Sequence, residues 1–112
     1  MRHRDKIVLQ KILNVIEETE EFLDNVSEEE FLEKNLLKSA VAMSIIRIGE
    51  LVKTLSAEFR QENSQVSWRD IAGFRDVAAH KYEIIDIKEL YDTAMKDFPE
   101  LKSQIIKILE TE

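Results

Sequence analysis

The stretch AVAMSIIRIGELVKTL, residues 40–55, decides the fold. It is apolar over more than one helical face, and its apolar period extends from Phe31 to Phe59. In so small a protein, a helix that is apolar on two sides needs two partners, and one of them can be a second copy of the chain. Gly49 costs about 1 kcal/mol relative to alanine inside a helix. We therefore expect it to serve close helix packing.

Further helices are predicted on both sides of this stretch. The long helix itself begins at the capping box of Ser27 and Glu30 and runs to about Arg60. A first helix is predicted from about Arg4 to Asp24, and another begins at the cap formed by Ser67 with Asp70 and ends near Lys81. A connector over residues 82–85 leads to a helix that is capped by Asp86 with Glu89 and runs from about Ile87 to Lys96. The last predicted helix has Pro99 in its first turn. The sequence thus predicts an all-α fold, an up-and-down bundle of four to five helices, forming one domain over residues 1–112.

Composition agrees with this fold. Of the 112 residues 44% are apolar and 35% charged, with two Gly and one Pro, a balance that favours helices over a sandwich or barrel. The chain has no cysteine, which excludes disulfides and thiolate metal sites and fits an intracellular protein. We find neither a signal-peptide core nor an apolar run that could cross a membrane. A cytoplasmic protein without a membrane partner is expected.

Charge limits the ways in which the chain could bind nucleic acid. Its net charge of −7 argues against broad, non-specific binding, which needs a basic surface. Residues 60–81 carry four basic and three acidic side chains, so this segment has a net charge of +1 and the rest of the chain −8. Such a patch can bind a phosphate but would not hold a long RNA alone. Self-association would place two such patches side by side and so strengthen the binding of RNA.

Residues 67–82 carry most of the chain's chemistry. His80 is the only imidazole outside the N-terminal segment and can act as a general base or acid near neutral pH. Arg75 offers a permanent charge whose geometry suits a phosphate and the extra charge of a phosphoryl-transfer transition state. Asp76 lies one helical turn before His80 and could orient its ring or raise its pKa. This set can cleave RNA through its own 2′-hydroxyl without a metal or another cofactor.

Helix geometry favours a site built from two copies of the chain. Five residues turn an ideal helix through about 500°, so Arg75 and His80 lie roughly 140° apart. They reach one phosphate only if the helix ends near His80 or if two subunits contribute. A single His80 also leaves the leaving group without an acid unless a partner subunit supplies its own.

Each of these residues also has a structural interpretation. His80 could be a helix cap or a packed ring, Arg75 a solvated ion-pair partner, and Tyr82 an aromatic at the rim. Asp76 with His80 could be half of a metal site, but a third ligand is missing from the pattern. Core positions are expected for Trp68 and Phe74, and either a buried ion pair or a solvent-facing helix edge for Arg47 and Glu50.

The motif Arg75-x4-His80-x-Tyr82 resembles that of the HepT-like toxins, a branch of the HEPN superfamily. The sequences Ile48-Gly49-Glu50 and Val66-Ser67-Trp68-Arg69-Asp70-Ile71 and the order of the helices agree, so the resemblance covers nearly the whole chain. Two packing positions differ: Leu90-Tyr91 stands where many relatives place a Trp, and Leu51 where a small Ala is common.

The resemblance implies a homodimer whose two motifs meet in a cleft and cleave RNA without a metal. Arg75 and His80 would be catalytic, with Asp76 in support. The implied partner is an MNT-type nucleotidyltransferase-fold antitoxin that silences the toxin by attaching AMP to Tyr82. Two other functions remain open: a non-catalytic subunit that binds a nucleotide or substrate for a nucleotidyltransferase, and a purely structural dimerisation bundle.

Overall fold

The computed structural model describes residues 1–111, and within that range the chain forms helices and turns with no strand. The predicted domain extends to Glu112, which lies outside the described residues. The helices are α1 (His3–Phe22), α2 (Glu28–Glu33), α3 (Asn35–Lys53), α4 (Ala57–Glu62), α5 (Trp68–His80), α6 (Ile87–Asp92) and α7 (Phe98–Glu110), with a 3₁₀ turn at Tyr82–Ile84 and a π-helical segment at Thr93–Asp97. The all-α prediction is confirmed.

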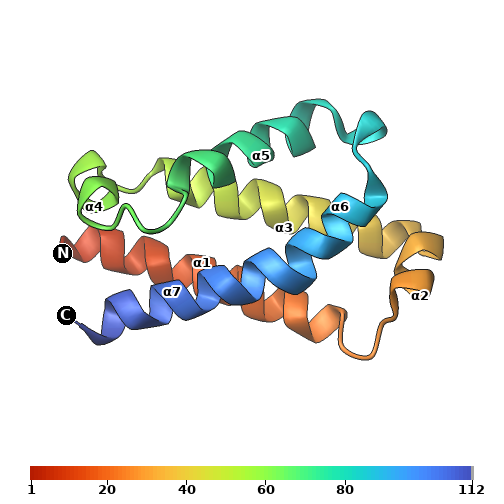
Figure 1. The fold of residues 1–112 in the computed structure, drawn as a ribbon, viewed down its shortest axis with the longest axis horizontal. Coiled ribbons are helices and arrows are strands. Elements are labelled where there is room, and N and C mark those ends of the chain that lie inside the picture. Colours follow the sequence, from red (N-terminus) through yellow and green to blue (C-terminus); the bar gives the residue numbers. More distant parts are fainter. Residues whose placement is uncertain (112) are drawn as a thin grey trace.

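The long helices alternate in direction (Figure 1). α1 and α5 run one way along the long axis of the molecule, while α3 and the rod made of α6 and α7 run back. α1 packs against α3 and α7, and α3 packs against α5 and α6. This is the up-and-down arrangement that the sequence predicts.

The prediction of one long helix from Ser27 to Arg60 is wrong, because the chain leaves the helical conformation twice. Lys34 is extended and separates α2 from α3. Ser56 is also extended and caps α4, its hydroxyl accepting a hydrogen bond from the amide of Phe59 at 3.1 Å. Ser56 in turn donates hydrogen bonds from its amide and its hydroxyl to the buried carboxylate of Asp5, at 2.9 and 2.7 Å. Such side-chain bonds compete with the helix, and the apolar period continues across both breaks because its residues still face the core.

The two predicted C-terminal helices form one rod. Pro99 lies in the first turn of α7, as expected, but no break precedes it. Proline lacks the N–H of the usual helical hydrogen bond, and its ring clashes with the carbonyl four residues earlier. The π-helical segment over Thr93–Asp97 widens the helix just before this position. The rod therefore passes Pro99 without leaving the helical conformation, since Asp97 and Phe98 keep helical dihedral angles.

The core lies between α1, α3 and the α6–α7 rod. Its fully buried aliphatic side chains, each contributing about 1.5–3 kcal/mol on burial, are Leu9, Ile12, Val15, Ile16, Val41, Ile48, Val52, Leu90 and Ile105. The hydroxyls of Thr19 and Ser44 meet at 2.9 Å between α1 and α3, so this buried polar pair is satisfied. None of the described helices is both long and apolar enough to cross a membrane.

Trp68 fixes the start of α5. Its indole Nε1 donates a hydrogen bond of 3.0 Å to the carbonyl of Asn63, and its ring lies 5.7 Å from that of Phe59. Trp68 is buried, as predicted, whereas Phe74 is only partly buried. Ser67 precedes the helix, but its hydroxyl accepts no hydrogen bond, so the predicted capping box does not form. Its ψ of 62° departs from the extended conformation that N-cap residues usually adopt.

α5 is supported mainly from one side. It packs along α3, which is the one helix that it contacts extensively in the described part of the chain. Figure 1 shows α5 at the edge of the bundle, with α3 between it and α1. Because α5 ends at His80 and carries Arg75, its contacts with α3 position the predicted site.

Candidate active site

Gly49 sets the distance between α3 and α5 at Arg75. It is buried, and a Cβ atom placed on it would lie 2.6 Å from Cγ of Arg75 and closer still to its Cβ. Real side-chain contacts of this kind lie near 3.5–4.0 Å. Only glycine therefore allows Arg75 to cross α3 at this point, which confirms the role in close packing expected for Gly49.

Two carboxylates hold the guanidinium of Arg75. Oε1 of Glu50 lies 2.6 Å from Nε, and Oδ1 of Asp76 accepts a hydrogen bond of 3.2 Å from Nη1. The Arg75 side chain is 20% exposed, and its Nε is buried and lacks a well-aligned hydrogen bond. The close approach of Glu50 is thus an ion pair rather than an aligned hydrogen bond. Nη2 makes no hydrogen bond within residues 1–111.

Lys53 completes a charged cluster with Glu50, Arg75 and Asp76. Its Nζ donates a hydrogen bond of 2.8 Å to Oδ1 of Asp76 and lies 3.8 Å from Oε1 of Glu50. The hydrogen bond from Lys53, and then that from Arg75, lower the pKa of Asp76 below its ordinary value of 3.8. Asp76 is therefore ionised near neutral pH, and the cluster joins two cations to two anions.

His80 lies apart from this cluster. It is the last residue of α5 and is exposed, and its side chain makes no hydrogen bond or ion pair within residues 1–111. Asp76, which was expected to orient the ring, contacts Lys53 and Arg75 instead. Because α5 remains helical through His80, the angle of roughly 140° between Arg75 and His80 persists in one chain. Within one chain, Arg75 and His80 therefore lie on different sides of α5.

Tyr82 anchors the turn that follows α5. It begins the 3₁₀ turn Tyr82–Ile84 in the predicted connector, and its ring is partly buried against the core. Its hydroxyl lies 3.5 Å from the hydroxyl of Ser39, an exposed residue of α3. The turn is therefore fixed to the first half of α3, with the phenol oxygen at the surface close to the end of α5.

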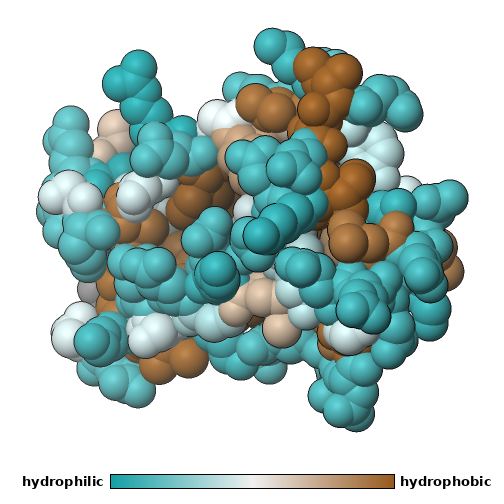
Figure 2. Space-filling model, turned by 45° about the vertical axis from the view of Figure 1, so that its right-hand side comes forward, coloured by the Kyte–Doolittle hydropathy of each residue, from teal (hydrophilic) through white to brown (hydrophobic). Residues whose placement is uncertain are grey.

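An outer apolar stripe, made of Leu36, Met43 and Ile84, lies toward the N-terminal end of α3, on the line that leads to Glu50 of the charged cluster. These side chains are 82%, 55% and 78% exposed. Leu36 and Met43 precede Glu50 at steps of seven residues, so all three lie along one line of α3. The contact of Tyr82 with α3 brings Ile84 to the same end. Figure 2 shows a band of hydrophobic side chains on the face turned forward.

Sequence reasoning missed the partners of this site. Arg47 and Glu50 form no pair with one another: Nη1 of Arg47 binds Glu18 at 2.9 Å, and Glu50 turns to Arg75. The position of Glu50 next to Gly49 could have identified it as a partner of the site. A residue beside a close helix crossing can reach the second helix. Of all the predicted site residues, only Arg75 and Asp76 are in direct contact.

Comparison with known proteins assigns the family. Residues 12–108 match the family described as "HepT-like: Ribonuclease HepT-like", which is most of the chain. The chain belongs to the HepT-like ribonuclease family. This membership confirms the predicted family and the predicted class of enzyme, a ribonuclease.

Individual relatives agree with the membership. The HepT-like chain is 32% identical over 108 residues to the probable ribonuclease HepT of Thermococcus cleftensis, covering 96% of this chain and 98% of that protein. It is 38% identical over 104 residues, 93% of each, to a Caldanaerobacter subterraneus protein that is provisionally named an RNase. A Methanocaldococcus jannaschii protein, named a gamma-glutamylcyclotransferase and provisionally an RNase, is 37% identical over 110 residues. The chain spans half the length of this last relative. No solved structure matches the chain.

Proposed function

We propose that this HepT-like chain is a metal-independent endoribonuclease that acts as a cytoplasmic homodimer of one domain, residues 1–112, and is the toxin of a toxin–antitoxin pair. The observation that carries the proposal is the placement of Arg75. Gly49 admits it to the helix crossing, Glu50 pairs with its Nε, and Nη2 makes no hydrogen bond within residues 1–111, which leaves it for a phosphate. A guanidinium fixed in this way can bind a phosphate at little entropic cost, because its position is set before the ligand arrives.

In the proposed reaction, His80 accepts the proton of a ribose 2′-hydroxyl. The 2′-oxygen forms a bond to the neighbouring phosphorus, and the bond from phosphorus to the 5′-oxygen breaks. The departing 5′-oxygen takes a proton, so the products are a 2′,3′-cyclic phosphate and a 5′-hydroxyl end. Arg75 stabilises the extra negative charge on the five-coordinate phosphorus. Asp76 supports Arg75 through the hydrogen bond to its Nη1.

The proposed cleft needs two copies of the chain. Arg75 and His80 are turned about 140° apart on one helix, whereas a two-fold axis can bring His80 of one copy to Arg75 of the other. The outer apolar stripe supports this arrangement, because water-exposed leucine and isoleucine on the line of α3 that leads to Glu50 favour contact with a second apolar surface. Once it holds the 2′-proton, the His80 of that pair supplies the acid for the leaving group.

Silencing by a nucleotidyltransferase-fold antitoxin is proposed to act at Tyr82. The phenol oxygen would bond to the α-phosphorus of ATP and displace pyrophosphate, leaving AMP on the tyrosine. Tyr82 lies two residues beyond His80, and its hydroxyl is close to that of the exposed Ser39. This position supports access of the antitoxin to the phenol oxygen. The added phosphate would compete with RNA for Arg75 and repel its backbone.

Cleavage of total cellular RNA in excess EDTA tests the catalytic proposal. Mass spectrometry first establishes that Tyr82 carries no AMP. Wild-type protein should produce cyclic-phosphate ends, and His80→Ala should not. His3→Ala, which alters the only other imidazole of the chain, is the matched control and should cleave like wild type. Absence of cleavage by unmodified wild type, together with retained nucleotide binding, would favour the non-catalytic subunit instead.

Mixing two inactive variants tests the shared cleft. If a cleft takes Arg75 from one copy and His80 from the other, Arg75→Ala mixed with His80→Ala rebuilds one intact pair in each mixed dimer. Half of the dimers are mixed after free exchange, so about a quarter of the wild-type activity should return. No recovery, with exchange proved by a tag pull-down, would contradict a pair divided between subunits.

A further inference from the structure

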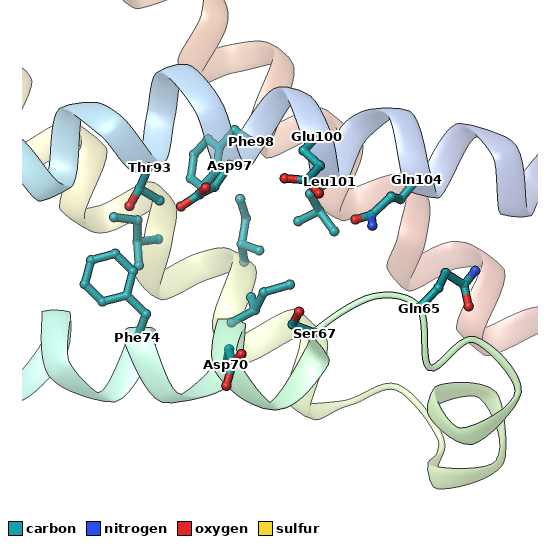
Figure 3. Close-up of a pocket in the computed structure, with 13 residues that line it drawn as sticks. Gln65, Ser67, Asp70, Phe74, Thr93, Asp97, Phe98, Glu100, Leu101 and Gln104 are labelled. Carbon is teal, nitrogen blue, oxygen red and sulfur yellow. The ribbon is translucent and has the colours of Figure 1, made fainter.

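A groove separates α5 from the α6–α7 rod, on the flank of α5 that Ser67, Asp70, Ile71 and Phe74 line. It encloses about 420 Å³, within the range of pockets that hold small ligands. The groove exists because α5 packs on α3 and makes no extensive contact with α7. Figure 3 shows side chains from both walls converging on the space between the helices.

The floor and the rim of this groove differ in chemistry. Apolar side chains form its interior, among them Ile48 of α3, Phe74 of α5 and Leu101 of α7. Carboxylates stand on both walls, Asp70 on α5 and Asp97 and Glu100 on the opposite rod. All three carboxylates are exposed and make no ion pair within residues 1–111, and no Lys, Arg or His lines the groove. The groove thus presents uncompensated negative charge around an apolar interior.

Thr93 provides an independent sign of a ligand. It lines the groove from the π-helical segment and is only 9% exposed, yet its side chain makes no hydrogen bond within the described residues. Its hydroxyl oxygen is not among the fully enclosed side-chain atoms that lack a partner, so water or a ligand can reach it. A ligand with an N–H donor in the groove would bond to the Thr93 oxygen.

We propose that this groove binds small aliphatic diamines in their diammonium form. The methylene chain would cover the apolar floor, one ammonium group would lie near Asp70, and the other near Asp97 and Glu100. A polyanion such as RNA is excluded by the same carboxylates. Because carboxylates stand on both walls, a ligand with a cationic group at each end should bind better than a ligand with only one cationic group. This site is independent of the proposed ribonuclease reaction, because Asp70 lies on another flank of α5 than Arg75, and Asp97 and Glu100 lie on the α6–α7 rod.

Titration of the ¹⁵N-labelled protein with 1,4-diaminobutane at about 150 mM NaCl tests the proposal. Amide shifts should be confined to residues 45–48, 65–74 and 93–104, which line the groove. The single-charge analogue 1-aminobutane should bind at least about threefold more weakly, and 1,4-butanediol should cause no comparable shifts. Thr93→Val, which removes the hydroxyl but keeps the shape, should weaken the diamine by roughly two- to tenfold.

Two double variants with the same net charge separate a site from general attraction to an acidic protein. Asp97→Asn with Glu100→Gln should weaken diamine binding about tenfold. Asp92→Asn with Glu110→Gln removes two carboxylates of the same rod that do not line the groove, and should bind like wild type. Equal binding by the two double variants, or 1-aminobutane binding as tightly as the diamine, would overturn the proposal.

Discussion

Replacing Gly49 with alanine should impair activity far more than stability. The new Cβ would lie 2.6 Å from Cγ of Arg75 and closer still to its Cβ, so it would be more than about 1 Å inside an ordinary carbon–carbon contact. α5 would then have to move away from α3 by more than about 1 Å. Overpacking of this kind costs about 1–3 kcal/mol, but alanine is better than glycine in a helix by about 1 kcal/mol. The free energy of unfolding should therefore fall by no more than about 2 kcal/mol. A shift of about 1 Å at a catalytic group can cost about 100-fold in rate.

Gly73→Ala is the matched control for this variant. Gly73 lies on α5, only two residues before Arg75, but a Cβ there would meet no atom within 4 Å. It should raise the free energy of unfolding by up to about 1 kcal/mol and leave RNA cleavage unchanged. Urea unfolding gives the stabilities, and initial rates of cleavage of one defined RNA give the activities. Full activity of Gly49→Ala, with wild-type stability, would refute the dependence of Arg75 on the glycine contact.

Three other variants test the surroundings of the site. Glu50→Ala should lower kcat for RNA about tenfold without raising KM, because Arg75 loses its positioning partner, and Glu50→Gln should restore part of kcat. Lys53→Met removes the strongest cause of the lowered Asp76 pKa. Because the pKa of Asp76 is lower in the folded state, its ionised carboxylate stabilises the fold above about pH 4, and this stabilisation is lost as the pH falls further. The free energy of unfolding of the variant, measured in urea, should therefore depend less on pH in that acid range. Trp68→Phe, which deletes the indole hydrogen bond, should lower the free energy of unfolding by about 1–2 kcal/mol.

Local signals in the sequence predicted the elements well where the cause is local. The Ser27 cap forms, with its hydroxyl accepting from the Glu30 amide at 3.1 Å, and Asp86 accepts from Lys88 at 3.0 Å. The break at Ser56 escaped prediction because its partner, Asp5, is 51 residues away in the chain. Periodicity alone does not reveal such a break, since the apolar residues keep their spacing across it.

The partners of Arg75 could not be read from the sequence for a similar reason. Glu50 and Lys53 lie on another helix, and which residues meet depends on where α3 and α5 cross. The sequence nevertheless held the cause of that crossing, Gly49. A glycine inside an apolar helix predicts a close approach, but it does not state which residue of which helix comes near.

The proposed division of the site between two copies rests on the straightness of α5. A helix that remains regular from Trp68 to His80 cannot turn residues 75 and 80 to one point. Arg75 must face α3, because Gly49 and Glu50 hold it there, and His80 then faces away from the charged cluster into solvent. Neither side chain can reach the other without unwinding the last turn of α5. A second copy covering the outer apolar stripe would remove this conflict without any change in the helix, which is why we favour a shared cleft over rearrangement of one chain.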